Sequence, residues 1–294
     1  MMATNIQQVP GIQRRKFGDI VVTALNDGFI MLPTEAVQGI AAADSAALYR
    51  SAGRRPPCRT AINTYLIQSP HNTVLVDAGC GKFMGPHLGR LPANLHAAGV
   101  LPHEVDRVLI THMHTDHVGG LLADDETAAY PRARVMISAK ELAYWSDRSN
   151  YDASPESTRD SFDVVAQVLG AYNGRIDTFD GGADIVPGIK ALPLNGHTPG
   201  HTGFEIGIGA SSLIIWGDVS HAPEVQMTLP DLTVIFDVDP ERAIASRRFI
   251  FERAASEDIM IAGMHIPFPG FTRIARSGDA YVSLPQVWQY ELLE

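Results

Sequence analysis

Cysteine is scarce in this chain of 294 residues. Only Cys58 and Cys80 occur, and they do not form a CxxC pair. The sequence therefore excludes a disulfide framework and a cysteine-based zinc knuckle, because both need several cysteines at short spacings. We expect two free thiols, which is the usual state of cysteine in a reducing compartment.

Long hydrophobic runs are also absent. A transmembrane helix needs about 20 consecutive apolar residues, and every apolar stretch here is far shorter. The basic residues Arg14, Arg15 and Lys16 are neither preceded nor followed by the apolar core of a signal peptide. We therefore expect a cytoplasmic protein that has no membrane as a partner.

Positive charge is in deficit, with 23 Lys and Arg residues against 33 Asp and Glu residues and a formal net charge of −10. Nucleic acids and anionic membranes bind basic surfaces, so neither is expected as a partner, and a ribonuclease activity is disfavoured. The composition is otherwise that of an ordinary globular protein, because 45% of the residues are apolar and 19% are charged.

No low-complexity segment or linker divides the chain, so we predict a single domain over residues 1–294. Short apolar strands alternate with helical segments and with Gly and Pro turns. This alternation is typical of an α/β protein. Here it favours two βαβ-type halves whose sheets face each other, with helices outside.

Local signals predict several individual elements. Residues 20–25 are expected to form a core strand that ends at the turn signal Asn26-Asp27-Gly28, and residues 34–51 an Ala-rich helix. Residues 147–160 predict an exposed loop, which is a candidate for a mobile cover over a site and equally a plain surface loop. Further strands are expected over 62–67, 73–76, 105–110, 134–138, 185–194, 202–208, 213–216 and 259–261, and helices over 88–98, 140–146, 158–170 and 240–255.

The densest chemical signal is the stretch Thr111–Gly120, which directly follows the apolar run Val108-Leu109-Ile110. It belongs at the C-terminal edge of a sheet, where α/β proteins place their chemistry. A polar strand-end loop is the alternative, but closely packed imidazoles and a carboxylate are costly to hold together without a cation. Within six positions the stretch offers four side chains that can bind a metal: His112, His114, Asp116 and His117.

Three further potential ligands each follow an apolar strand: His197 in the loop Asn195–Thr202, Asp218 after residues 213–215, and His265 after residues 259–261. One potential ligand after each of four core strands indicates a common site rather than four structural residues. The first stretch offers a His pair and an Asp–His pair. These are two incomplete ligand sets, which favours two metals about 3.5–4 Å apart.

The later residues complete both ligand sets. Asp218 would bridge the two ions through its two carboxylate oxygens. One ion could be held by His112, His114 and His197, and the other by Asp116, His117 and His265. Five imidazoles and two carboxylates suit Zn²⁺ first, and also Mn²⁺, Co²⁺ or Fe²⁺. We therefore predict two divalent metal ions per chain.

Taken together, these motifs resemble the metallo-β-lactamase superfamily. They are HxHxDH at 112–117, GHTPGH at 196–201, Gly217-Asp218 and His265, in the right order over most of the chain. The resemblance implies an αββα sandwich, in which two mixed β-sheets carry helices on their outer faces and a dinuclear site lies between the sheets. It implies the same division of ligands, with Asp218 between the metals.

Within the superfamily, the chain is most similar to methyl parathion hydrolase-like enzymes and their lactonase and arylesterase relatives. The signals for this are softer: Asn63–Leu66, Val74–Asp77, Gly85–Gly89, Asn94-Leu95, Ala97–Gly99 and His265–Gly270. The resemblance is also compatible with a homodimer.

The predicted activity is that of a dinuclear zinc hydrolase with a small-molecule substrate. It would attack an ester, lactone or organophosphate triester bond with a metal-bridging hydroxide. Asp116 or Asp218 could pass a proton to the leaving group.

The substrate walls are less well defined. Phe83, Trp145 and Phe268 lie near the metal motifs in sequence and resemble the aromatic lining of methyl parathion hydrolase-like enzymes, although each could equally be a core residue. His221 follows Asp218 by three positions and could face the substrate.

Two residues beside the motifs are expected to support the site. His201 is expected to brace the loop that holds His197. Asp77, at the end of a buried strand, is either structural or orients one of the ligands.

Two alternative activities stay open. The chain could be an acyl-homoserine lactonase, although it has no Tyr between Asp218 and Phe236, where the resemblance to those enzymes implies one near the metals. It could also be a mononuclear-iron persulfide dioxygenase that uses His112, His114 and either Asp218 or His197. The complete second ligand set argues against the latter. A non-catalytic binding protein would be expected to have a broken ligand set, and this set is intact.

Overall fold

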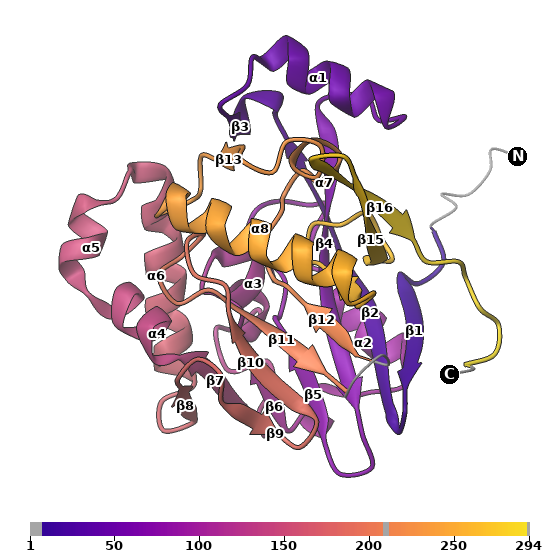
Figure 1. The fold of residues 1–294 in the computed structure, drawn as a ribbon. Coiled ribbons are helices and arrows are strands. Elements are labelled where there is room, and N and C mark those ends of the chain that lie inside the picture. The colour runs from indigo at the N-terminus through magenta and orange to yellow at the C-terminus, as the bar shows by residue number, and fades with distance from the viewer. Residues whose placement is uncertain (1–7, 208–211, 293–294) are drawn as a thin grey trace, which may run out of the picture.

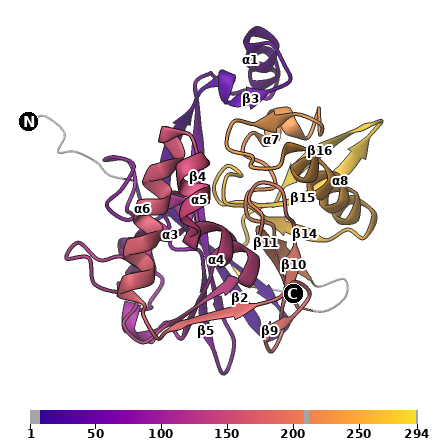
Figure 2. The ribbon, with the colours of Figure 1, turned by 90° about the vertical axis from the view of Figure 1, so that its left-hand side faces the viewer.

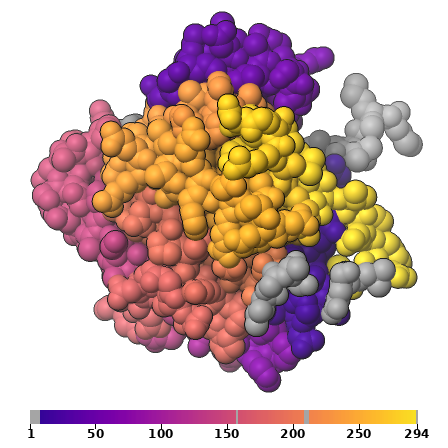
Figure 3. Space-filling view, in the orientation of Figure 1, coloured from indigo at the N-terminus to yellow at the C-terminus, as the bar shows by residue number. Residues whose placement is uncertain are grey.

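The computed structural model describes residues 8–207 and 212–292. Two mixed β-sheets lie face to face, and helices cover the outer face of each (Figure 1, Figure 2). The predicted α/β sandwich is therefore confirmed. Helix α1 (Ala42–Ser51) lies at one end of the sandwich, beside a small sheet of β3 (Val37–Gln38) and β13 (Thr233–Val234) (Figure 1, Figure 3).

Each large sheet has seven strands. The first sheet contains, in spatial order, β1 (Ile12–Phe17), β2 (Ile20–Leu32), β4 (Cys58–Gln68), β5 (Thr73–Val76), β6 (Arg107–Leu109), β7 (Arg134–Ser138) and β8 (Ile176–Phe179). The second contains β16 (Ala280–Pro285), β15 (Phe271–Ser277), β14 (Met260–Ala262), β12 (Leu213–Ile215), β11 (Thr202–Ile206), β10 (Ile189–Pro193) and β9 (Asp184–Val186).

The remaining helices connect these strands. They are α2 (Leu91–Ala97), α3 (Thr115–Val118), α4 (Ala139–Ser146), α5 (Arg148–Ala153), α6 (Glu156–Ala171), α7 (Pro223–Gln226) and α8 (Pro240–Ser256), with short 3₁₀ turns at Thr34–Ala36, Pro102–Glu104 and Gly119–Leu121. None of the helices in the described part of the chain is both long and apolar enough to cross a membrane.

Consecutive side chains of the central strands enter different hydrophobic cores. In β4, Tyr65 and Ile67 pack between the two sheets, whereas Leu66 packs on the helix-covered face of the first sheet. In β12, Ile215 packs between the sheets and Ile214 packs with residues of α8. Because side chains alternate across a strand and both faces of each sheet are covered, all of β12 is apolar and residues 62–67 of β4 are all buried.

Two pairs of parallel strands set the position of the polar loops. β5 pairs with β6 in the first sheet, and β12 pairs with β14 in the second, each in parallel. Parallel neighbours end at the same edge of their sheet, so the loops that follow them begin beside one another. Three of the four stretches that carry predicted metal ligands follow these strands, namely β6, β12 and β14, and the fourth, with His197, follows β10.

The predicted turn at Asn26-Asp27-Gly28 is wrong, because β2 continues through these residues to Leu32. A bulge between Asn26 and Gly28 shifts the register against β4, and Gly28 has a φ of +133°, which glycine adopts at little cost. The polar side chains that predicted a turn bond to neighbouring segments instead. Asn26 Nδ2 donates to Asn63 Oδ1 at 3.1 Å, for example.

The predicted loop over 147–160 is also wrong, because these residues form α5 and the start of α6. Asp147 caps α5 by accepting a hydrogen bond from the backbone N–H of Ser149 at 2.8 Å, and Pro155 directly precedes α6. The residues that predicted a loop are therefore helix caps.

Three further predictions hold only in part. The strand predicted over 185–194 is two antiparallel strands, β9 and β10, which Pro187-Gly188 separates. The predicted helix over 34–51 is limited to α1, since a 3₁₀ turn and β3 occupy residues 34–38. The strand predicted over 202–208 matches β11 as far as Ile206, and residue 208 lies outside the described residues.

Ile67→Ala is expected to destabilise the fold because Ile67 is only 2% exposed between the two sheets. The lost contacts and the cavity left behind should lower the free energy of unfolding by about 2–5 kcal/mol, measured by urea denaturation. Leu284→Ala, at a position that is 46% exposed, should change it by no more than about 0.5 kcal/mol. Equal effects of the two substitutions would contradict this placement of the core.

Candidate metal centre

The residues predicted as metal ligands come from loops of both sheets and meet at one edge of the sandwich. Their ligand atoms form two groups, and within each group they lie within 4.8 Å of one another. One group is His112, His114 and His197, and the other is Asp116, His117, Asp218 and His265. A third group of the same kind, His197, Asp218 and His221, overlaps the first two.

The first group consists of three imidazoles whose nitrogens converge. His114 Nδ1 lies 2.9 Å from His112 Nε2 and 3.0 Å from His197 Nε2. Burial, together with the neighbouring imidazoles, holds the pKa of His112 and of His114 well below the usual range. Both rings are therefore neutral, which is the form of His that binds a metal ion.

Asp218 lies between the two groups. Its Oδ2 atom is 2.9 Å from His265 Nε2, 3.3 Å from His117 Nε2 and 3.5 Å from His197 Nε2. Burial alone would raise the pKa of Asp218, but the surrounding imidazoles, His117 first, hold this pKa well below the usual range. The side chain is therefore an ionised carboxylate that reaches both groups.

The donor atoms fit divalent cations. His117 Nε2 and Asp218 Oδ1 are buried and have no hydrogen-bond partner among the described residues. A buried polar atom without a partner is costly, and cations held by the two groups would give both atoms one. Imidazole nitrogens and carboxylate oxygens are also the donors that Zn²⁺ and similar ions accept in proteins.

Asp77 orients His117. Its Oδ2 lies 2.7 Å from His117 Nδ1, and the carboxylate also accepts hydrogen bonds from the backbone N–H of Thr111 at 2.8 Å and from its hydroxyl at 2.7 Å. A hydrogen bond to the second nitrogen of a ligand histidine fixes the tautomer and the ring orientation. Of the two roles that the sequence left open for Asp77, the structure has the orienting one.

Two other proposed ligands are held in the same way. His197 Nδ1 lies 2.9 Å from Asp237 Oδ1, and His265 Nδ1 lies 3.0 Å from the carbonyl oxygen of Ala61. Asp237 was not among the predicted site residues. It lies 40 positions from His197, and nothing in the sequence between them links the two.

His201, the second histidine of the GHTPGH motif, braces the loops as expected. Its Nδ1 donates to the carbonyl oxygen of Leu194 at 2.8 Å, and its Nε2 accepts the backbone N–H of Asp218 at 2.9 Å. Burial lowers the pKa of His201 to about 3, so the ring is neutral and can both donate and accept.

Glu141 was not predicted, and it joins the loops of the two motifs. Its Oε1 accepts hydrogen bonds from the backbone N–H of Met113 at 3.0 Å and from Trp145 Nε1 at 2.6 Å. Its Oε2 accepts from Thr198 Oγ1 at 2.8 Å and from the backbone N–H of Gly200 at 2.9 Å. In the sequence, Glu141 is only an acidic residue in the first turn of a predicted helix. Such residues are common because they interact favourably with the helix dipole, so this position does not indicate a site.

Two buried polar residues in apolar strands hold the neighbouring loops. Asp27 accepts hydrogen bonds from backbone N–H groups at both ends of segment 80–91, which carries Phe83. Asn63 Nδ2 donates to the carbonyl oxygen of Ile266 at 2.8 Å, directly after the last proposed ligand. A polar residue inside an apolar strand is the signal that could have found both, because it must have a buried partner.

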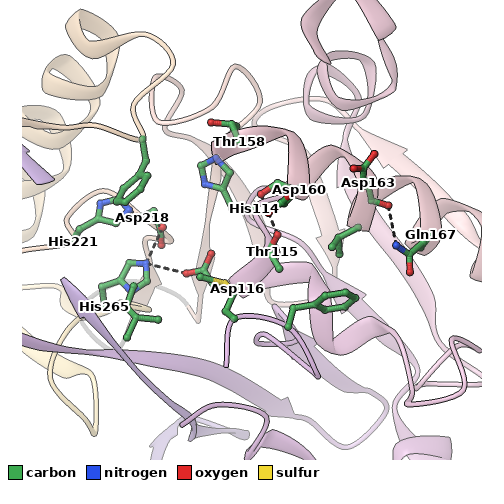
Figure 4. Close-up of a pocket in the computed structure, with 16 residues that line it drawn as sticks. His114, Thr115, Asp116, Thr158, Asp160, Asp163, Gln167, Asp218, His221 and His265 are labelled. Atoms are coloured by element: carbon green, nitrogen blue, oxygen red, sulfur yellow. Dashed lines mark hydrogen bonds and ion pairs between the residues drawn. The ribbon is translucent and has the colours of Figure 1, made fainter. Parts of the chain in front are cut away.

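A cavity of about 550 Å³ lies against the second ligand group (Figure 4). Its walls come from β2, segment 80–91, α3, α6, and the loops that follow β12, β13 and β14. Four of the proposed metal ligands are among its lining residues: His114, Asp116, Asp218 and His265.

Two of the four predicted pocket residues, Phe83 and His221, line this cavity, and Trp145 and Phe268 do not. Trp145 is only 4% exposed and packs behind the ligands, with its ring edge-on to His114 at 5.4 Å between centroids. Phe268 is 38% exposed and lies outside the cavity. The prediction that Trp145 and Phe268 line the pocket is therefore wrong, because both are close to a metal motif in sequence but not to the cavity in space.

His221 lies beside the proposed bridging residue. Its Nε2 is 3.0 Å from Asp218 Oδ2, and its ring stacks on His265 with 4.8 Å between centroids. Burial lowers the pKa of His221 to about 4, so the ring is neutral. Its Nδ1 is buried and has no hydrogen-bond partner among the described residues.

The family model of the metallo-beta-lactamase superfamily matches residues 59–257, a span that contains all of the proposed ligands except His265. The chain belongs to the metallo-beta-lactamase superfamily. The sandwich of two mixed sheets is the fold of this superfamily, and the His and Asp groups described above could hold the ions of a dinuclear metal site of the superfamily.

Individual relatives agree with this membership. The chain is 24% identical over 217 residues to the N-acyl homoserine lactonase AiiA of Bacillus thuringiensis subsp. kurstaki, covering 67% of this chain and 78% of the lactonase. The solved structure of hydrolase AbOPH of the beta lactamase superfamily has a TM-score of 0.91 at 29% identity, covering 96% of this chain and 100% of AbOPH.

A further solved relative is AidC, described as a dizinc quorum-quenching lactonase in complex with a product. It has a TM-score of 0.89 at 23% identity, covering 95% of this chain and 99% of AidC, and this likeness shows the fold alone. Membership of the superfamily and the likeness to AbOPH make the chain a metal-dependent hydrolase.

Asp77→Asn is expected to weaken metal binding by about 10- to 100-fold, because His117 loses the carboxylate that fixes its tautomer. Competition with a chromophoric chelator measures the affinity. Asp19→Asn, at an exposed position in the turn between β1 and β2, removes the same charge away from the site and should leave the affinity unchanged. Equal affinities of Asp77→Asn and the unsubstituted protein would contradict the orienting role.

Removing the metal ions is expected to destabilise the chain, because the buried carboxylates and imidazoles lose the cations between them. At a free Zn²⁺ concentration of roughly 100 to 1,000 times the Kd, bound metal stabilises the folded chain by about 3–4 kcal/mol. Thermal unfolding over a series of Zn²⁺ concentrations measures this. A Tm that does not rise with Zn²⁺ would argue against a site that forms only in the folded chain.

Proposed function

We propose that this chain is a dinuclear zinc hydrolase of ester and lactone bonds, with a side activity on organophosphate triesters. The observation that carries the proposal is the position of Asp218. Its carboxylate reaches both ligand groups and lines a cavity of about 550 Å³. A carboxylate shared by two ligand groups beside a cavity is the arrangement that two-metal hydrolysis needs.

The two ligand groups support a division of the residues between two ions. His112, His114 and His197 would hold one ion, Asp116, His117 and His265 would hold the other, and Asp218 would be shared. When bound, two such ions supply an activated water molecule as nucleophile and a Lewis acid for the carbonyl or phosphoryl oxygen. The proposal therefore needs no Ser or Cys nucleophile, and the buried thiols of Cys58 and Cys80 are not among the cavity lining.

Asp116 is the better placed of the two carboxylates to move a proton. Its side chain is 12% exposed and lines the cavity, whereas that of Asp218 is 2% exposed. Burial alone would raise the pKa of Asp116, but His117 and then His265 hold this pKa below the usual range. The ionised carboxylate can accept a proton and pass it to the leaving group.

The cavity also suits an acyl or aryl group. Ile30, Phe83, Met84 and Phe236 supply apolar side chains to its lining. AiiA is named as an N-acyl homoserine lactonase, so lactones that carry an acyl chain are our first candidate substrates. Arylesterase and methyl parathion hydrolase-like activity, the homodimer and the cytoplasmic location stay predictions of the sequence analysis.

A mononuclear-iron persulfide dioxygenase is the rival within the fold. It would use a single ligand group, whereas this chain has a second group with four ligand atoms within 4.8 Å of one another. The hydrolase is therefore the better supported hypothesis. Oxygen consumption by iron-loaded protein in the presence of a thiol persulfide distinguishes the two.

The zinc-loaded chain is expected to hydrolyse an N-acyl homoserine lactone, dihydrocoumarin and 4-nitrophenyl acetate, and methyl paraoxon more slowly. Asp218→Ala removes the shared carboxylate and should lower kcat/KM by at least about 10²-fold for each substrate. Initial rates on the whole panel, with the metal content of every preparation measured alongside, test this.

Asp19→Asn serves again as the charge-matched control and should retain the rates of the unsubstituted chain. Two bound metals per chain without turnover above that of Asp218→Ala would refute the hydrolase proposal. Persulfide-dependent oxygen consumption in the same preparation would support its rival.

A further inference from the structure

The cavity beside the ligand groups has two chemically different walls. Helix α6 forms one of them through Asp160, Asp163, Val164 and Gln167, with Thr158 and Ser161 beside them. Positions 160, 163, 164 and 167 follow the i, i+3, i+4, i+7 spacing of a single helix face. One face of α6 is therefore turned to the cavity, and most of its side chains there are polar or acidic.

The opposite side of the cavity holds Asp218, His221 and His265 (Figure 4). His221 Nδ1 on this side is buried and has no hydrogen-bond partner among the described residues. The proposed ions account for Asp218 Oδ1, and three of their ligands, Asp116, Asp218 and His265, line the cavity here. The reacting group of a substrate belongs at this end, and the rest of the molecule extends toward α6.

The charge of the α6 wall has one sign. Neither Lys nor Arg is among the lining residues of the cavity. Asp160 and Asp163 are exposed, and within the described ranges neither forms an ion pair with a basic side chain. Arg159, four positions before Asp163 on the same helix, donates to the backbone carbonyls of Tyr151 and Asp152 instead, so a substrate that lies along α6 meets the field of both carboxylates.

Hydrogen bonds hold Ser161 and Gln167, the polar side chains beside the two acidic residues. Ser161 Oγ lies 3.0 Å from Thr115 Oγ1, on the short helix that carries Asp116. Gln167 Nε2 donates to the backbone carbonyl of Asp163 at 3.4 Å (Figure 4). The wall thus continues from the ligand group to the outer cavity without a basic residue.

We propose that the α6 wall selects substrates by charge: the site accepts neutral and, preferentially, cationic substituents distal to the scissile bond and rejects anionic ones. The inference rests on the proposed ester and lactone hydrolysis, and it names the substrate class of that site. At low salt, one exposed carboxylate changes the affinity for a charged group by up to about fivefold. Two carboxylates should therefore make the affinity for a cationic substituent about tenfold or more higher than that for an anionic one.

Three 4-nitrophenyl esters of equal length test the proposal. They end in a trimethylammonium group, a tert-butyl group of the same shape, and a carboxylate. With the zinc-loaded full chain, kcat/KM is expected to fall in that order, by about tenfold or more from the first to the last. High ionic strength should compress this ratio, because exposed charges are screened.

Paired variants locate the effect. Asp160→Asn with Asp163→Asn should bring the cationic-to-anionic ratio of kcat/KM close to one. Asp152→Asn with Glu156→Gln removes the same net charge at exposed positions of α5 and α6 that do not line the cavity, and it should keep the ratio of the unsubstituted chain.

The outcomes separate the two proposals. Hydrolysis of all three esters at equal rates would overturn charge selection by α6 and leave the hydrolase proposal standing. A cationic-to-anionic preference that survives in the Asp160/Asp163 variant would also overturn it. Hydrolysis of none of the esters by chain with two bound zinc ions would overturn the hydrolase proposal, and charge selection with it.

Discussion

The carboxylate of Asp218 lies within 3.6 Å of the Nε2 atoms of five buried imidazoles, those of His112, His117, His197, His221 and His265. Burial alone would lower the pKa of His117 and of His265, but the carboxylates of Asp218 and Asp116 raise it, so bound cations would take the place of protons on these two rings. The fold brings the cluster together by ending β5, β6, β12 and β14 at one edge. Asp77 and Asp237 fix the rings of His117 and His197, and the carbonyl oxygen of Ala61 fixes that of His265, so that their Nε2 atoms converge on Asp218.

The convergence of the proposed ligands could be predicted from sequence, because each follows an apolar strand or lies in a motif of short spacing. The orienting residues could not, since their partners are far away in the chain. Asp237 is 40 positions from His197, and Glu141 is 57 positions from Thr198. Within its own segment each is an ordinary acidic residue. Only the packing of one sheet on the other gives them a role.

The cavity walls were predicted least well, for a related physical reason. Trp145 was assigned to the pocket from its place in sequence, yet its helix turns it toward Glu141 and the back of His114. The face of α6 that does line the cavity lies within the helix predicted over 158–170, but nothing in the sequence indicated that this face is turned to the cavity. Apolar runs and short motifs predict the strands and the proposed ligands. The side of a helix that faces a cavity depends on tertiary contacts, which a local pattern does not contain.

Each proposed ion would take ligands from both sheets. The first sheet contributes the residues of the HxHxDH motif after β6, and the second contributes His197 and His265 after β10 and β14. A bound ion would therefore act as a cross-link between the two layers. Like other cross-links, it would restrict the unfolded chain far more than it alters the folded one. The layers could not separate at this edge without releasing metal. Retention of metal would thus report that the sandwich is closed, whatever the substrate.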